Sequence, residues 1–151
     1  MASRAAAEKA FQSVENVLGG KRVLGVKPQS SLDWVAMIRE GIPAMAVEPI
    51  LSAVRLSQAE LAEALGIPER TLARRKREGI LNSEESSKLL RLARVISRAS
   101  QVFADPAAAV NWLKSPNAAL SGNAPLSLLD TDIGAEAVLD SLGRIEHGVF
   151  A

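Results

Sequence analysis

Residues 57–77 read SQAELAEALGIPERTLARRKR and predict a pair of short helices at the centre of the chain. Ser57 is followed three residues later by Glu60, the spacing of a capping box, in which each side chain bonds the backbone amide of the other residue. Gly66 permits the positive φ that ends a helix, and Pro68 fits the first turn of the next one, where its missing N–H is not needed. One helix therefore begins near Ser57, and a second begins near Pro68.

The residues that face inward in this pair predict a helix-turn-helix. Leu61, Ala62 and Leu65 form the inner stripe of the first helix. A small residue at Ala62, a glycine four positions later and a buried aliphatic at Leu72 allow the two helices to cross closely.

The second helix, expected from Glu69 to about Glu78, is strongly basic. By charge alone, this run fits a solvated surface as well as a ligand site. In a helix-turn-helix, however, the second helix lies in the major groove with its N-terminal residues at base edges. The candidate base or groove contacts are Glu69, Arg70, Thr71 and Arg74, and the candidate backbone contacts are Arg75, Lys76 and Arg77.

The first half of the chain adds further helices. Residues 2–18 have apolar side chains at helical spacing, and Gly19-Gly20 ends them. Residues 21–26 alternate poorly and suggest an extended connector, after which helical spacing resumes at Leu32, Val35, Ile38 and Ile42. A helix expected from Pro43 to about Val54 contains Pro49, so it is either kinked there or begins there.

The second half is also helical, which makes the predicted fold class all-α. Asn82 with Glu85, or Ser83 alone, caps a long helix, and Asp105-Pro106 opens another that runs to Trp112-Leu113. Pro and Gly residues punctuate the loop that follows. The apolar stripe of the long helix is Leu89, Leu92, Ala93, Ile96, Ala99 and Phe103, and that of the last helix is Ala135, Val138, Leu142 and Ile145.

The composition narrows the range of possible functions. The 151 residues suffice for one compact domain or two small ones, and no apolar run approaches the roughly 20 residues of a membrane span. With no Cys and one His, multi-histidine metal sites and thiolate chemistry are excluded, and no metal or cofactor is expected. Residues 1–98 hold 16 Lys and Arg against 11 Asp and Glu, whereas residues 99–151 hold 2 against 6, which predicts different partners for the two parts. We expect a cytoplasmic protein.

The chain ends in a small apolar segment after a glycine, Gly148-Val149-Phe150-Ala151. This pattern is typical of an apolar probe on a hinge. A tail folded back onto its own core explains the residues equally well.

The ordered series of short blocks from about Gly41 to the end resembles the Xre/MbcA/ParS toxin-binding antitoxins. The blocks include Leu56-Ser57-Gln58, Arg70-Thr71-Leu72-Ala73-Arg74-Arg75-Lys76, Ala109-Val110-Asn111-Trp112-Leu113, Thr131-Asp132-Ile133-Gly134-Ala135 and Leu142-Gly143-Arg144-Ile145-Glu146-His147-Gly148-Val149-Phe150. The resemblance implies an antitoxin that neutralises a RES-domain toxin consuming NAD, and that represses its own operon through the helix-turn-helix. It further implies that the C-terminal domain covers the toxin's active-site cleft. The toxin contacts would then be Arg144, His147, Gly148, Val149, Phe150 and Ala151.

These inferences give an N-terminal helical segment over residues 1–40 that could dimerise, a DNA-binding domain over 41–98 and a toxin-binding domain over 99–151. The expected partners are the toxin, the double-stranded operator and a second copy of the chain. One alternative is a stand-alone dimeric repressor whose C-terminal half binds an effector or dimerises. Another is an enzyme that uses Asp130 and Asp132, although such a pair in a loop is more often a helix cap.

Overall fold

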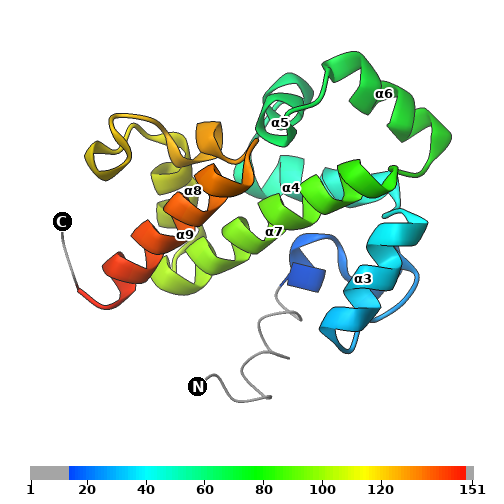
Figure 1. Cartoon of the computed structure of the whole chain (residues 1–151), viewed down its shortest axis with the longest axis horizontal. Helices are drawn as coiled ribbons and strands as arrows, with labels where there is room; N and C mark the ends of the chain where they lie inside the picture. Colours follow the sequence, from blue (N-terminus) through cyan, green and yellow to red (C-terminus); the bar gives the residue numbers. More distant parts are fainter. Residues whose placement is uncertain (1–13, 149–151) are drawn as a thin grey trace.

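The computed structural model describes residues 14–148, and all regular elements in that range are helices (Figure 1). This confirms the predicted all-α class. The α-helices are α2 (Gly20–Leu24), α3 (Ser31–Glu40), α4 (Val47–Val54), α5 (Gln58–Leu65), α6 (Glu69–Glu78), α7 (Ser83–Phe103), α8 (Pro106–Lys114) and α9 (Asp132–Glu146). Three 3₁₀ helices, η1 (Ala44–Ala46), η2 (Ala118–Leu120) and η3 (Pro125–Leu128), complete the order.

Helix α7 runs through the middle of the molecule and contacts α3, α5, α8 and α9. It begins with the predicted capping box, in which Asn82 Oδ1 accepts from the Glu85 amide at 2.8 Å and Glu85 Oε1 accepts from the Asn82 amide at 2.9 Å. The predicted apolar stripe is confirmed, because Leu89, Leu92, Ala93, Ile96 and Ala99 are buried and Phe103 packs at the edge of the core. The boundary expected after residue 98 falls inside this continuous helix.

The helix-turn-helix consists of α5 and α6, as the sequence predicts. Ser57 and Glu60 form both hydrogen bonds of the capping box, at 3.1 and 3.0 Å. Gly66 ends α5 with φ of 70°, and Pro68 stands immediately before the first residue of α6. Leu72 is completely buried against the first helix and its neighbours.

Pro49 lies in the first turn of α4, which begins at Val47 after the 3₁₀ turn η1. A proline in a first turn breaks no hydrogen bond, because the N–H groups there have no intrahelical acceptor. Of the two expectations for this proline, a helix that begins close to it is therefore nearer to the structure than a kink.

The region before residue 41 differs from the prediction in two places. The extended connector predicted over residues 21–26 is wrong, because α2 occupies Gly20–Leu24 after a left-handed turn at Gly19 and buries Leu24. The helix around Leu32 is present, but α3 buries Trp34 and Met37, while Leu32 and Val35 are exposed. Of the helix predicted over residues 2–18, positions 14–17 are helical, and residues 1–13 lie outside the described range.

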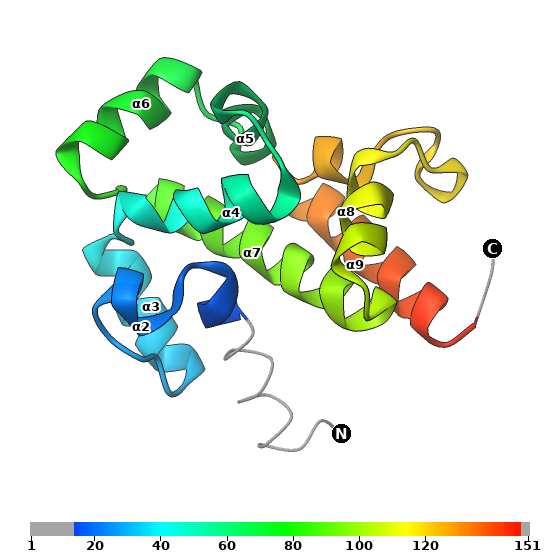
Figure 2. The same ribbon diagram turned by 180° about the vertical axis from the view of Figure 1, so that it is seen from behind.

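The C-terminal part packs α8 and α9 onto the second half of α7, and α9 runs in the same direction as α7 (Figures 1 and 2). Asp105 caps α8 as expected, with its Oδ1 accepting from the Ala107 amide at 3.1 Å. Trp112 is half-buried, and its ring lies 5.7 Å from that of Phe103. Within the described residues, no helix is long and apolar enough to cross a membrane.

Candidate functional site

The solvent-facing side of α6 carries cations. Arg70, Arg74 and Arg77 are exposed and recur at the three- and four-residue spacing that places side chains on one helix face. Arg74 Nε lies 3.5 Å from Glu78 Oε1, a solvent-exposed pair that holds the arginine only loosely. Glu69 is exposed at the N-terminus of the helix, and Thr71 is half-buried.

Arg75 turns away from that face and joins α6 to α7. Its Nε donates to Glu85 Oε1 at 2.8 Å, and its Nη1 donates to Glu78 Oε2 at 3.1 Å. Its side chain is 20% exposed and that of Glu85 only 7%, so the pair is largely shielded from water. The hydrogen bonds that Arg75 donates, first to Glu85 and second to Glu78, raise the pKa of Arg75. Arg75 is therefore occupied within the molecule.

Lys76 is likewise engaged, with the two helices that precede α6. Its Nζ lies 2.7 Å from Glu48 Oε1 on α4 and donates to Gln58 Oε1 on α5 at 2.9 Å. The inward direction of both cations has a cause in the sequence: they follow the buried Leu72 by three and four residues, so they share its helix face. The prediction from the sequence did not use this spacing, because it assigned Arg75, Lys76 and Arg77 together to the DNA backbone.

The end of α6 is fixed by backbone contacts. The Leu81 amide donates to Ile42 O at 3.0 Å, and the Ala44 amide donates to Gly79 O at the same distance. The Ile42 amide in turn donates to Ser86 Oγ on α7 at 2.8 Å. The cationic face of α6 thus sits on a helix held at its end and along its inner side.

Of the predicted toxin-contacting residues, Arg144 lies in the last turn of α9, and His147 and Gly148 follow that turn, at the end of α9 that is far from α6 (Figures 1 and 2). Arg144 and His147 are exposed, and Gly148 turns the chain with φ of 70°. Val149, Phe150 and Ala151 lie outside the described residues.

A forked ion pair fixes the end of α9 against α7. Arg98 donates through Nη1 and Nη2 to the two carboxylate oxygens of Glu146, at 2.8 and 2.7 Å. The hydrogen bonds from Arg98 lower the pKa of Glu146, and the same bonds raise the pKa of Arg98. A bidentate pair fixes the relative orientation of its two side chains as well as the distance between them. The last turn of α9 is therefore held in a defined orientation against α7.

Of the two carboxylates Asp130 and Asp132, both exposed, Asp132 takes part in contacts that hold the start of α9. Asp132 Oδ1 accepts from Arg91 Nη1 at 2.6 Å, while Arg91 Nε donates to Leu129 O at 3.0 Å. Thr131, between the two aspartates, caps α9 by accepting from the Gly134 amide at 3.0 Å. In the range 14–148, no three acidic or histidine side chains are grouped so that they could hold a metal ion.

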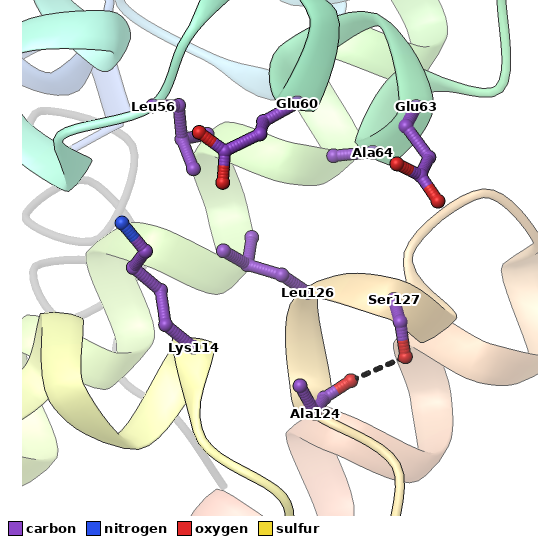
Figure 3. A pocket seen from close by; sticks show the side chains of 8 residues that line it. All are labelled: Leu56, Glu60, Glu63, Ala64, Lys114, Ala124, Leu126 and Ser127. Atoms are coloured by element: carbon purple, nitrogen blue, oxygen red, sulfur yellow. Dashed lines mark hydrogen bonds between the residues drawn. The ribbon is translucent and has the colours of Figure 1, made fainter.

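A pocket of about 190 Å³ marks the junction of the two parts of the chain (Figure 3). Leu56, Glu60, Glu63 and Ala64 line it from the side of α5, and Lys114, Ala124, Leu126 and Ser127 from the other side. Two of its charged groups already have partners, since Lys114 Nζ donates to Arg55 O at 2.9 Å and Glu60 Oε1 accepts from the Ser57 amide at 3.0 Å. Hydrogen bonds from Ser57, and secondarily the charge of Lys114, lower the pKa of Glu60. We regard the pocket as a gap at the interface between the two domains.

Comparison with protein families divides the chain in a similar way. Residues 33–94 match the antitoxin Xre-like helix-turn-helix domain. Residues 98–148 match the antitoxin Xre/MbcA/ParS C-terminal toxin-binding domain. The first match contains α6 and its cations, and the second contains α8 and α9.

Curated relatives carry the same description. The antitoxin Xre of Yersinia enterocolitica is 35% identical over 86% of this chain and 89% of its own length. The Prs ADP-ribosylating antitoxin of a Sphingobium strain is 27% identical over 81% of this chain and 83% of its own length.

A solved structure supports the fold. The crystal structure of the M. tuberculosis MbcT-MbcA toxin-antitoxin complex contains a chain with a TM-score of 0.55 and 24% identity, which covers 72% of this chain and 96% of that one. The protein is thus an antitoxin of a toxin–antitoxin system with a C-terminal toxin-binding domain. This assignment replaces the alternative of a stand-alone repressor. The chain belongs to the Xre/MbcA/ParS family of antitoxins.

Proposed function

We propose that this antitoxin neutralises a RES-domain, NAD-degrading toxin by covering its active-site cleft, and that it represses its own operon by inserting α6 into DNA. The observation that carries the proposal is the separation of two exposed surfaces at opposite ends of the molecule, joined by α7 (Figure 1). One is the cationic face of α6, and the other is the acidic C-terminal part, residues 99–151.

On the DNA side, Arg70, Arg74 and Arg77 form the contact face. Glu69, Arg70 and Thr71 begin α6, in the part of a recognition helix that reaches base edges, and Arg74 follows one turn after Arg70. Arg77 lies in the last turn and contacts phosphate. Arg75 and Lys76, which sequence reasoning assigned to phosphates, instead position the helix through Glu85 and Glu48.

A single helix-turn-helix contacts a short half-site, so the chain works as a dimer on two half-sites about 34 Å apart. The operator and the toxin are both intracellular, which places the protein in the cytoplasm.

On the toxin side, the charge of the C-terminal part supports its binding to the toxin. Residues 99–151 hold 2 basic and 6 acidic side chains. A cleft that binds NAD must offer positive groups or backbone amides to its pyrophosphate, so an acidic domain complements it and accelerates association.

The test is co-expression with the toxin encoded beside this chain, followed by purification and an assay of NAD consumption. A stoichiometric complex without NAD-degrading activity, which regains activity when the antitoxin is removed, is the expected result. A neighbouring toxin that leaves NAD intact on its own contradicts the assigned toxin class. Absence of binding to the operon's own promoter contradicts autorepression.

A further inference from the structure

The toxin-binding domain exposes a large apolar side chain on its outermost helix. Ile133, the second residue of α9, is 80% exposed. Among the described residues, the other exposed large apolar side chains are Val26, Leu32, Val35, Met45 and Ile80, all of which are less exposed than Ile133 and precede the toxin-binding match at 98–148. Within that match, Ile133 is therefore the one exposed apolar anchor that the described residues offer.

Ile133 shares a helix face with the residues expected to contact toxin. Ile133, Asp140, Arg144 and His147 are exposed and, with the half-buried Ala137, recur at alternating spacings of four and three, which places them in one row along α9 and its C-cap. The opposite face of α9 is covered, because Ala135, Val138 and Leu142 are buried against α7 and its neighbours. The row is about 20 Å long, at the rise of an α-helix, and it ends where the chain turns at Gly148.

We propose that this row is the body of the toxin interface and that Ile133 is its apolar anchor, at the end remote from the chain terminus. The inference rests on the proposed function, in that the toxin must bind the C-terminal domain. It extends the contact from the terminal residues along the whole outer face of α9.

The occupant is the toxin, and two observations support this choice. The row is continuous with the residues at the end of α9, and it lies within the part of the chain that matches a toxin-binding domain. Glu136 and Asp140 flank the apolar position on the exposed side of the helix, and this acidic rim suits a toxin whose cleft is cationic. Interfaces commonly combine such a desolvated apolar centre with a charged rim.

The chain supplies a matched control for this position. Leu32 is the second residue of α3 and is 75% exposed, and it also follows a serine or threonine cap. Ile133→Gln and Leu32→Gln therefore make the same chemical change at equivalent helix positions in the two parts of the molecule. Ile133→Ala, which retains high helix propensity, provides a second variant at the tested site.

The affinity of each full-length variant for the toxin is measured by calorimetry, with thermal unfolding as a check on folding. We expect Ile133→Gln and Ile133→Ala to raise the toxin Kd at least tenfold at an unchanged melting temperature, while Leu32→Gln stays within twofold of the wild type. An Ile133 variant that binds toxin within twofold of the wild type overturns the inference, including the case in which it loses self-association instead. If the wild-type chain itself fails to bind the toxin, the proposed function fails, and the inference fails with it.

Discussion

Arg75 on α6 and Glu85 on α7 join the cationic helix to the helix that continues into the toxin-binding domain, with Nε donating to Oε1 at 2.8 Å. The same Glu85 oxygen accepts from the Asn82 amide at 2.9 Å and so completes the cap of α7. The Glu85 carboxylate thus caps the N-terminus of α7 and also holds the inner side of α6. The orientation of the cationic face depends on this contact.

We expect Arg75→Ala to lower the melting temperature by several degrees, because it leaves the Glu85 carboxylate, 7% exposed, without its cationic partner. Arg77→Ala is the control, since Arg77 is exposed on the same helix. Thermal unfolding followed by circular dichroism measures both. Equal melting temperatures for the two variants would show that the Arg75–Glu85 pair does not anchor α6.

A second prediction concerns the exposed face of α6. Replacing Arg70, Arg74 and Arg77 together with alanine should weaken operator binding and reduce the slope of log affinity against log salt by about 0.9 for each phosphate that is no longer neutralised. Arg70→Ala alone should relax sequence preference, by about 1–3 kcal/mol if its side chain bonds a base. Fluorescence anisotropy over a range of salt concentrations gives both quantities.

The triple variant also tests the separation of the two surfaces. It should still neutralise toxin in cells at equal antitoxin levels, because the substituted residues lie at the other end of α7 from α9. Toxicity in such cells, with the variant shown to be folded, would contradict the modular arrangement. An unchanged slope of log affinity against log salt would show that α6 does not contact the DNA phosphates.

Sequence reasoning succeeded where a local interaction decides the structure. The capping boxes at Ser57 and Asn82 each depend on residues three positions apart, so their partners are visible in the sequence. It failed where burial depends on distant elements. Leu32 has the spacing of an inner residue, yet α7 and its neighbours cover Trp34 on another side of α3, and nothing local distinguishes the two faces.

The candidate site was predicted in the same uneven way. The location of the basic helix follows from the turn around Gly66, which is local. The partners of Lys76, Glu48 and Gln58, are 28 and 18 residues away along the chain, and only the folded structure brings them together. The side on which Lys76 lies could be inferred from Leu72, but the acceptors could not.

Two glycines of α9 should respond oppositely to alanine. A Cβ at Gly134 would lie 1.8 Å from Leu128 O, which is backbone and cannot yield easily, whereas a Cβ at Gly143 meets nothing within 4 Å. We expect Gly134→Ala to destabilise by about 1–3 kcal/mol or more through overpacking, and Gly143→Ala to stabilise by about 0.5–1 kcal/mol through helix propensity. Urea unfolding measures both. A Gly134→Ala protein as stable as the wild type would mean that Leu128 and Thr131 do not hold the start of α9 as described.

The Arg98–Glu146 pair predicts a dependence of stability on pH. Arg98 lowers the pKa of Glu146 from its ordinary value of 4.5, so the pair stabilises the folded state above that pH and loses its effect as pH falls through the lowered value. Arg98→Gln should therefore reduce the melting temperature at pH 7, and the difference from the wild type should shrink toward pH 3. The effect is modest, because both side chains are partly exposed. A difference that stays constant over this range would show that the charge of Glu146 plays no part.

The last prediction concerns the terminal residues after the turn at Gly148. Arg98 fixes Glu146, and Gly148 has φ of 70°, where a Cβ would meet nothing within 4 Å. Burial of an apolar side chain such as Val149 or Phe150 contributes roughly 1.5–3 kcal/mol. If that burial occurs in the toxin, deleting residues 148–151 should weaken toxin binding tenfold or more at an unchanged melting temperature and unchanged DNA affinity. If the segment instead packs on its own helix, the melting temperature should fall, and toxin affinity should fall only with the folded fraction. Measuring both quantities on the one truncated protein separates these outcomes, and an unaltered toxin affinity would exclude residues 148–151 from the interface.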